Sequence, residues 1–366
     1  MDKVSKKLPT FPWDTLSEAT KCATSHPGGI VDLSVGTPVD PVPQVAIDAL
    51  TETAPAASGY PQVWGSAGLR KAIINYLARI WNACGLVDDN VLPVMGTKEF
   101  VGWLPIQLGI DENCNVIIPT RAYPTYEVGA LLAGARVIRC DDPEKVKDKP
   151  ALIWINYPAN PTGAVADVGL VRAWIKFAQD NGAVLASDEC YGEFWWDKKP
   201  VSILDPTVND GCLTGLLACH SLSKRSNMAG FRAGFAAGDE DLISELLKVR
   251  KHTGAMIASP VQAAMKAALN DDEHVEIQRR RYRLRREKLA NALVAAGFRI
   301  DESAGSIYLW ATQDKPCRES VSWLADRGIL VAPGDFYGDQ THVRVGLTAS
   351  DERIEAACAR LVSQAG

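Results

Sequence analysis

The feature that most constrains the fold is a series of short, uninterrupted apolar runs separated by longer stretches with helical spacing. Continuous apolar runs, unlike alternating ones, indicate strands that are buried on both faces. The segment 167–181 begins at an acidic residue and ends before glycine, which predicts one of the covering helices. We therefore predict an α/β fold with a mostly parallel central sheet flanked by helices. The expected strands are 90–94, 115–119, 135–139, 152–156, 183–186, 216–220 and 233–236.

The pattern changes after residue 260. Residues 260–296 have helical spacing almost without interruption, which predicts one long helix that crosses between two domains. The later segments predict a smaller α+β unit, with strands at 298–300, 307–312 and 342–347 and helices at 319–327 and 351–364. A chain of 366 residues exceeds what one core usually fills. We expect an N-terminal arm that completes the small domain (1–45), a large domain (46–280) and a small C-terminal domain (281–366).

Composition excludes several classes of protein. The chain has 39 basic and 44 acidic residues, a net charge of −5, which disfavours nucleic acid and anionic membranes as partners. No uncharged apolar run reaches the roughly 18 residues that a membrane-spanning helix needs. Residues 1–14 contain lysines but no apolar stretch, so we expect no signal peptide. The nine cysteines form no C-x-x-C pair and are typical of reduced thiols. We expect a soluble cytoplasmic protein.

One segment, 279–288, has seven basic residues in ten. It could form a surface patch that binds nucleic acid or a protein partner. It could also be the solvated face of the long helix, paired within that helix from Glu276 to Arg280 and with the acidic residues just before it. We favour the solvated face, because such a charge run carries little recognition information by itself.

The densest chemical signal is the segment 220–232. A predicted strand leads into a serine-rich loop that contains Lys224, and Arg232 follows eight residues later. A nearby cation favours the neutral form of a lysine, which a Schiff base with an aldehyde requires. Serine hydroxyls and a guanidinium can together hold a phosphate dianion. A lone lysine is usually a surface group, so this interpretation depends on partners elsewhere.

Polar and aromatic residues follow other predicted strands. Asp188 comes at the end of one buried run and Tyr191 follows three residues later, although Asp188 alone would also suit a helix N-cap or an ordinary acid in a loop. Ligands of α/β sheets bind at the carboxyl ends of the strands. Further strand ends supply Asn160 in Asn-Pro-Thr-Gly, Thr97 and Lys98 at a helix start, and Tyr123.

Together these residues supply a phosphate cradle, a buried acid, an aromatic ring, an amide, a phenol and an amine. Pyridoxal 5′-phosphate (PLP) needs this set. The elements S-x-S-K-x-x-x-x-x-G-x-R, D-E-x-Y and N-P-T-G are all present. On these motifs the chain resembles the fold-type I PLP enzymes of the class I/II aminotransferase family, from Leu33 to Arg344. The resemblance implies a large domain that binds PLP and a smaller α+β domain.

The resemblance also implies roles for residues that match the family motifs. Lys224 would bind the cofactor aldehyde and later move a proton, and Asp188 would pair with the pyridine nitrogen. Asn160 and Tyr191 would hydrogen-bond the cofactor O3′ atom, and Tyr123 would stack on the ring. The phosphate would be held by Thr97, Lys98, Ser221 and Arg232.

Three further matches concern the substrate and the assembly. Gly36 and Arg344 match the family's contacts to the substrate carboxylate, and Asn160 also lies near the substrate in this scheme. Arg344 could also be an ordinary exposed arginine on a strand, without a role in binding. Tyr60 matches a tyrosine that reaches the phosphate of the neighbouring subunit. The resemblance therefore implies a homodimer with shared active sites, acting on small amino acids and 2-oxo acids.

Several stretches, such as 33–41, 94–99 and 329–338, resemble the actinobacterial succinyldiaminopimelate aminotransferases. This implies that N-succinyl-L,L-2,6-diaminopimelate and 2-oxoglutarate give N-succinyl-2-amino-6-oxopimelate and glutamate, in lysine and diaminopimelate biosynthesis. The distal carboxylates would need cationic donors, for which Lys98, Arg121 and Arg225 are candidates.

Two groups of alternatives stay open. One is another class I/II aminotransferase of aromatic, alanine or aspartate type, for which Trp64 could supply an aromatic pocket. The other is a C–S lyase or decarboxylase on the same fold. The chain has no G-x-G pair, which excludes a Rossmann dinucleotide site. Its histidines lack the spacing of metal ligands, so we expect no metal site.

Overall fold

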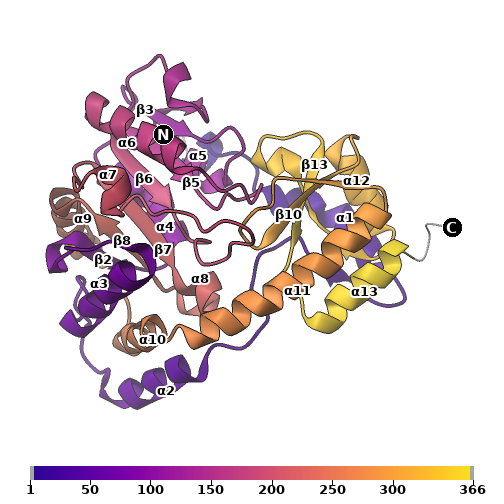
Figure 1. The fold of residues 1–366 in the computed structure, drawn as a ribbon, viewed down its shortest axis with the longest axis horizontal. Coiled ribbons are helices and arrows are strands. Elements are labelled where there is room, and N and C mark those ends of the chain that lie inside the picture. Colours follow the sequence, from indigo (N-terminus) through magenta and orange to yellow (C-terminus); the bar gives the residue numbers. More distant parts are fainter. Residues whose placement is uncertain (1–3, 363–366) are drawn as a thin grey trace.

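The computed structural model describes residues 4–362. Residues 1–3 and 363–366 belong to the expected first and last units and lie outside the described residues, as do the last two positions of the predicted helix 351–364. Figure 1 shows a large sheet with helices on both faces and a second, smaller layer of strands and helices beside it. The long helix α11 runs between the two parts.

The large sheet has seven strands in the order β2-β8-β7-β6-β5-β3-β4. All strands run parallel except β8, which is antiparallel to both of its neighbours. The sheet therefore confirms the predicted class, and each predicted strand is present within a few residues. The strands are β2 (Val91–Val94), β3 (Asn115–Ile118), β4 (Arg136–Arg139), β5 (Leu152–Asn156), β6 (Val184–Asp188), β7 (Leu216–Ser221) and β8 (Gly234–Gly238).

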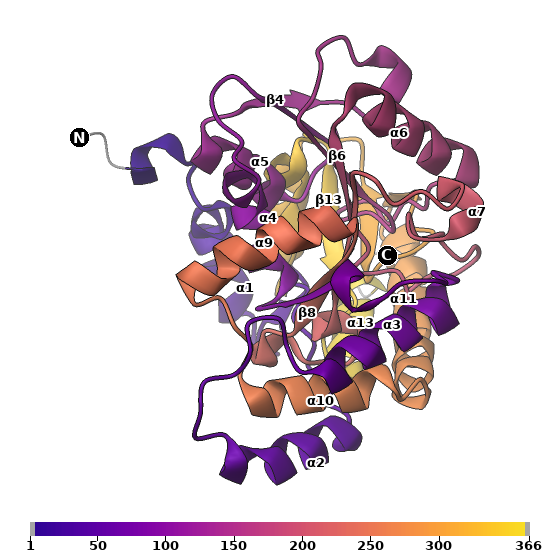
Figure 2. The ribbon, with the colours of Figure 1, turned by 90° about the vertical axis from the view of Figure 1, so that its left-hand side faces the viewer.

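Helices cover both faces of this sheet, because alternate strand residues point to opposite sides. Ile153 packs in the core with α3 (Ala67–Trp81), α6 (Val168–Asn181) and α10 (Ser259–Leu269). Trp154 packs on the other face with α4 (Thr97–Gln107), α5 (Pro124–Ala133) and α9 (Glu240–Thr253). As predicted, α6 is capped by Asp167, whose carboxylate accepts from the Leu170 N–H at 2.8 Å. Figure 2 shows α10 beside α2 (Gln44–Thr53).

The prediction of one helix over 260–296 is wrong at its middle. The chain forms α10 and then α11 (Glu273–Ala295), with a break at residues 270–272. In this break the carboxylate of Asp271 accepts from the Glu273 N–H at 2.9 Å. Short polar side chains compete with the helix for backbone hydrogen bonds, which explains the interruption. α11 still runs from the large sheet to the small one, as the pattern predicted.

The smaller part has a four-stranded antiparallel sheet in the order β12-β13-β10-β9. A parallel pair joins β1 near the N-terminus to β11, and one apolar cluster contains both Val31 and the C-terminal helices. The two-residue strands β1, β11 and β12 were not predicted. The elements are β1 (Val31–Asp32), β9 (Arg299–Asp301), β10 (Tyr308–Thr312), β11 (Ile329–Leu330), β12 (Ala332–Pro333), β13 (His342–Gly346), α1 (Ser17–Ser25), α12 (Cys317–Ala325) and α13 (Asp351–Val362).

The basic run on α11 is only partly a solvated face. Arg285 is buried, and its guanidinium donates to both carboxylate oxygens of Asp40, at 2.7 and 2.8 Å, and to Asp351 at 2.7 Å. The intrahelical pair joins Glu276 to Arg279, not to Arg280 as predicted. Within the described residues, part of this charge therefore serves to hold the chain's own N-terminal segment on α11.

Candidate active site

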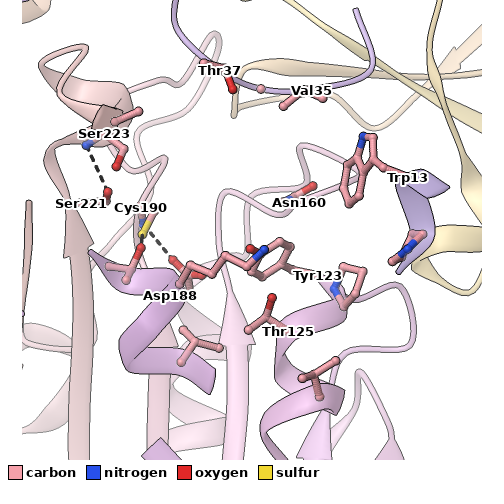
Figure 3. Close-up of a pocket in the computed structure, with 18 of the residues that line it drawn as sticks. Trp13, Val35, Thr37, Tyr123, Thr125, Asn160, Asp188, Cys190, Ser221 and Ser223 are labelled. Atoms are coloured by element: carbon pink, nitrogen blue, oxygen red, sulfur yellow. Dashed lines mark hydrogen bonds between the residues drawn. The ribbon is translucent and has the colours of Figure 1, made fainter. Parts of the chain in front are cut away.

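A cavity of about 930 Å³ lies where the carboxyl ends of the large sheet face the smaller part and the N-terminal segment (Figure 3). The structure brings together eleven of the twelve residues that the sequence analysis assigned to a site. Strand ends, helix starts and a segment far away in the chain all contribute to its wall. The eleven residues are Gly36, Thr97, Lys98, Tyr123, Asn160, Asp188, Tyr191, Ser221, Lys224, Arg232 and Arg344.

Lys224 lies on α8 (Leu222–Arg225), directly after β7. Its Nζ atom donates a hydrogen bond to the carbonyl of Gly36. Burial is the main reason that the pKa of Lys224 is lowered, and the cations of Arg344 and Arg232 lower it further. The sequence motif indicated only the neighbouring cation as the cause of this shift. The arrangement favours an amine that can lose its proton and act as a nucleophile.

Asp188 is the last residue of β6 and is only 6% exposed. Its carboxylate accepts from the Tyr126 hydroxyl at 2.7 Å and from the Cys190 N–H at 3.2 Å. Burial raises its pKa. Within residues 4–362 no cation forms an ion pair with it, and no helix begins there, so it is not an N-cap. A buried acid of this kind suits a cationic group of a ligand.

Aromatic rings form one side of the cavity. Tyr123 precedes α5, and its ring meets the Tyr126 ring edge-on with a centroid distance of 5.7 Å. Tyr126 in turn stacks on Trp154 at 5.0 Å. Burial raises the pKa of Tyr123 to about 12, so the phenol stays neutral. This stack fixes the Tyr123 ring beside the space above Asp188, as Figure 3 shows.

The opposite end of the cavity can hold an anion. Helix α4 begins at Thr97, and its first N–H groups have no partner within the helix. Gly96 has a φ of 79°, and a Cβ there would lie 2.5 Å from the Arg232 guanidinium. The Ser221 hydroxyl accepts from the Ser223 N–H at 3.1 Å. A cradle of backbone N–H groups, hydroxyls and arginine is suited to phosphate.

Arg344 comes from β13 and is fully buried, so the exposed-arginine alternative is wrong. Its guanidinium donates to Asn160 Oδ1 at 2.8 Å and to the Ser34 carbonyl at 2.7 Å. It also lies 3.9 Å from the centre of the Tyr308 ring. Its Nε atom has no hydrogen-bond partner among the described residues. A guanidinium held this way can bind a carboxylate in the cavity.

Tyr308 is a site residue that the sequence analysis missed. Its hydroxyl lies 3.3 Å from that of Tyr191, and a Cβ on Gly36 would collide with it. A tyrosine inside an apolar strand looks like an ordinary core residue, so sequence gave no signal. Tyr126 was also missed: it lies on α5, outside the cavity wall, and acts through its hydrogen bond to Asp188. The N-terminal wall was also missed, with Phe11, Pro12 and Trp13 lining the cavity.

Of the three cations considered for the distal carboxylates of the substrate, only one lines the cavity. Arg121 lies outside the cavity and pairs with Asp339 at 3.0 Å and Glu302 at 3.3 Å. Arg225 is buried beneath the site and also does not line the cavity. Lys98 does line it, with its amine 5.7 Å from the centre of the Phe11 ring. Of the three, Lys98 is therefore the one positioned to meet a substrate.

Two more residues lie away from this cavity: Tyr60, the twelfth assigned residue, and Trp64, which was considered for an aromatic pocket. Trp64 packs 3.9 Å from the Arg70 guanidinium and does not form the aromatic pocket that the sequence allowed. Tyr60 is 97% exposed and lines a separate, smaller cavity of about 650 Å³. Within one chain Tyr60 does not join the other site residues.

The family comparison decides what this site is. The model of the family described as aminotransferase class I and II matches residues 29–361. The chain belongs to that family. It is 54% identical to a probable aminotransferase of Mycobacterium tuberculosis, over 98% of this chain and 86% of the relative. It is 51% identical to the 4-dedimethylamino-4-oxo-anhydrotetracycline transaminase of Streptomyces rimosus, over 97% and 99%.

A solved structure gives the same result. The chain matches a probable N-succinyldiaminopimelate aminotransferase of Thermus thermophilus with a TM-score of 0.86 and 27% identity, over 96% of this chain and all of that one. The protein is therefore a PLP-dependent aminotransferase with small amino and 2-oxo acids as substrates. Within residues 4–362 no helix is long and apolar enough to cross a membrane, and no group of metal-ligating side chains is found.

The donor set of the cavity fits PLP. A phosphate needs the N–H groups and the guanidinium at the start of α4, where only a glycine leaves room beside Arg232. A pyridine nitrogen that carries a proton needs an acid, and Asp188 is buried without an ion-pair partner in the described chain. An aldehyde needs an amine, and Lys224 lines the same cavity as these two groups.

Proposed function

We propose that this aminotransferase holds PLP between Tyr123 and the end of β6. When bound, PLP supplies an aldehyde that carries the amino group and a ring that accepts electrons. Lys224 would bind the aldehyde and later move a proton to and from the substrate. Asp188 would pair with the ring nitrogen, and Tyr191 and Asn160 would hydrogen-bond the ring oxygen. Thr97, Ser221 and Arg232 would hold the phosphate, and Lys98 would bind either this phosphate or a distal carboxylate of the substrate.

The substrate would lie on the other side of the lysine. Arg344 would bind the α-carboxylate through its guanidinium, with Asn160 fixing the plane of that group at 2.8 Å. Gly36 leaves the space that Tyr308 and the substrate need, because any side chain there would collide with the tyrosine. The observation that carries this proposal is the single cavity lined by a partly buried amine, a buried acid and a buried guanidinium.

Borohydride reduction tests the position of the cofactor. Reduction of the PLP-loaded protein and peptide mass spectrometry should find the pyridoxyl group on Lys224. A Lys224→Ala protein should lose turnover while it keeps its fold. Label on another lysine, or a Lys224→Ala protein with full turnover, would remove the central assignment.

For the substrate, we propose N-succinyl-L,L-2,6-diaminopimelate, with 2-oxoglutarate as amino acceptor. The support is the Thermus thermophilus neighbour and the resemblance of whole segments. A cavity of about 930 Å³ has room for a long substrate, and Lys98 lines it where a distal carboxylate could reach. The reaction would give N-succinyl-2-amino-6-oxopimelate and glutamate, in lysine and diaminopimelate biosynthesis.

A second candidate is a bulky ring-bearing carbonyl compound. The N-terminal wall is apolar, with Leu8, Pro9, Phe11 and Trp13 lining the cavity. The Streptomyces rimosus relative, whose name specifies an anhydrotetracycline substrate, is 51% identical. The wall and this likeness favour an aromatic substrate over alanine or aspartate.

A panel of amino donors against 2-oxoglutarate separates these candidates by kcat/KM. The panel contains succinyldiaminopimelate, LL-diaminopimelate, phenylalanine, alanine, aspartate and an aminotetralin. The first candidate requires succinyldiaminopimelate to have the highest kcat/KM, and the second requires the aminotetralin to have it. Conversion of bound cofactor to its pyridoxamine form distinguishes transamination from C–S cleavage or decarboxylation, since only transamination leaves the amino group on the cofactor.

We further propose that the protein is a homodimer and works in the cytoplasm. All nine cysteines are free, which suits a reducing compartment. The exposed Tyr60 is the motive for the dimer, since its assigned role needs a second subunit.

A further inference from the structure

Lys224 lies on a helix of only four residues, too short to hold its own geometry. The three residues that follow it are each bound to the start of α11 or its first turns. These contacts join α8 to the start of α11, in addition to the hydrogen bond that the Leu222 N–H donates to the Ala233 carbonyl at 3.1 Å. The pairs are Arg225 with Asp272 at 3.3 Å, Ser226 with His274 at 2.9 Å, and Asn227 with Gln278 at 3.1 Å.

Arg225 makes the most extensive of these contacts. It is 4% exposed, and its Nε atom donates to the Glu193 carboxylate at 2.6 Å. Its Nη1 atom donates to the Ala268 carbonyl at 2.7 Å, and its guanidinium lies 4.9 Å from the centre of the Tyr76 ring. All three of its nitrogens have partners, so Arg225 is not available to bind a substrate carboxylate.

The partners of Arg225 come from three different elements. Glu193 lies on the turn after β6, two residues beyond Tyr191. Ala268 belongs to the last turn of α10, whose carbonyls have no partner within the helix. Asp272 lies in the break that separates α10 from α11. Arg225 therefore joins the lysine-bearing turn to the point where the interdomain helix begins.

We propose that Arg225 is a positioning residue that holds α8 so that the Lys224 amine stays at its reacting position in the cavity. The inference rests on the role proposed above for Lys224. Arg225 acts through the backbone, since its guanidinium points away from the cavity toward Glu193 and α10. A displacement of the amine by about 1 Å is enough to lower the rate about 100-fold.

A matched control is available on α3. Arg79 binds the same Asp272, at 2.7 and 2.9 Å, and the carbonyl of Leu269 at 2.8 Å, but it does not adjoin Lys224. Arg225→Met and Arg79→Met therefore both remove a contact to Asp272, although the Arg79 side chain is 39% exposed and that of Arg225 only 4%. Arg225→Lys keeps the positive charge but loses the several N–H donors of the guanidinium. We expect it to retain more activity than Arg225→Met and less than the wild type.

The first measurement is hydrogen–deuterium exchange in the cofactor-free protein. Arg225→Met should accelerate exchange in the peptide spanning 221–228 about tenfold and leave the strands of the large sheet unchanged. Arg79→Met should leave that peptide at the wild-type rate. If the 221–228 peptide exchanges at the wild-type rate in Arg225→Met, the inference is wrong.

The second measurement combines the variants with chemical rescue. In the PLP-loaded protein with Lys224 intact, Arg225→Met should lower kcat about 100-fold. In a Lys224→Ala protein supplied with methylamine, Arg225→Met should lower the rescued kcat by about threefold or less, because the soluble amine is not held by α8. Equal loss in both backgrounds, or loss in neither, would overturn the inference.

The outcomes separate the two levels of the argument. A Lys224→Ala protein that turns over without methylamine contradicts the proposed function itself. If Lys224→Ala is inactive without methylamine, and Arg225→Met has the same effect on kcat in both backgrounds, only the inference about Arg225 is contradicted. If Arg225→Met does not fold, Glu193→Gln replaces it, since it removes the ion pair and leaves the arginine; the same coupling, of smaller size, is then expected.

Discussion

At the scale of single residues, the site places charged groups where burial opposes their charge. Asp188 and Lys224 both have pKa values shifted by burial toward their neutral forms. Such placements reduce stability unless a ligand compensates for them. The sequence predicted both residues from motifs, but it could not show that burial, and not a neighbouring cation, dominates the shift at Lys224. Tyr308 escaped prediction because a strand tyrosine has no distinguishing pattern.

Asp188→Asn should stabilise the cofactor-free protein and weaken the loaded one. The raised pKa of Asp188 means that the folded state binds more protons than the unfolded state above about pH 4, so stability falls as pH rises through this window. Asp188→Asn has no carboxylate to ionise, so its stability should not fall in this way. We expect its free energy of unfolding at pH 8 to exceed that of the wild type by on the order of 1 kcal/mol. Urea unfolding at pH 4 and pH 8 measures this difference.

With PLP present, Asp188→Asn should be less stable than the wild-type protein. Loss of a buried ion pair costs about 3–5 kcal/mol, so PLP affinity should fall at least about 100-fold. Spectroscopic titration with PLP measures the affinity. Equal affinity in Asp188→Asn and wild type would mean that the carboxylate does not face the ring nitrogen.

Arg344→Lys should raise KM for amino acids and lower kcat/KM by about 10- to 100-fold. A lysine keeps the charge but cannot reproduce the fork that contacts Asn160 and the Ser34 carbonyl. An amine substrate that lacks the carboxylate should react equally slowly with both proteins. Arg121→Gln is the control, because its ion pairs lie outside the cavity, and its kinetics should match wild type.

At the scale of elements, regular patterns were predictable and interruptions were not. Most strands of the large sheet follow from continuous apolar runs, because burial on both faces leaves little choice of residue, whereas the edge strand β4 is exposed at both ends. The break between α10 and α11 depends on one capping aspartate and on arginines from distant segments. No local pattern shows such partners. The start of α4 was predictable only in part. Gly96 indicates a backbone conformation that favours glycine, but the sequence does not show its contact with Arg232.

Gly96→Ala should weaken PLP binding through its phosphate. The residue has a φ of 79°, and a Cβ would press on the Arg232 guanidinium. We expect about 10- to 100-fold loss of PLP affinity, and little change for pyridoxal, which lacks the phosphate. Gly85→Ala is a matched control, because its φ is 87° and nothing lies within 4 Å of its Cβ position. Both variants should lose stability in thermal melts, and only Gly96→Ala should discriminate PLP from pyridoxal.

At the scale of the whole molecule, the site lies between segments from both ends of the chain. Val31 near the N-terminus pairs with Ile329, and Arg344 from the small sheet meets Asn160 from the large one. We propose the units 1–45, 46–280 and 281–366, with α11 as the connection between the last two. Sequence patterns predicted that the first residues complete the C-terminal unit, but not that residues 8–13 close the cavity. Short apolar and proline-rich segments have no period that indicates where they pack.

Tyr60 provides the last prediction, because the role that its motif implies needs a second subunit. A tyrosine that is 97% exposed contributes little to the stability of one chain, so Tyr60→Phe should leave the melting temperature unchanged. If its hydroxyl binds the phosphate of the neighbouring site, the variant should lose about tenfold in PLP affinity. Sedimentation velocity should show a dimer for both proteins.

Mixed dimers test which subunit Tyr60 serves. One subunit carries Lys224→Ala and the other carries Tyr60→Phe, and turnover is measured at limiting PLP. If Tyr60 reaches across the interface, both defects fall in the same site and the second site is intact, so the purified mixed dimer should have about half of the wild-type activity. If Tyr60 serves its own subunit, each site carries one defect and the activity at limiting PLP stays near the level of the single variants. Recovery therefore requires both the dimer and a shared site, since no arrangement of independent subunits can produce an intact site from these two chains.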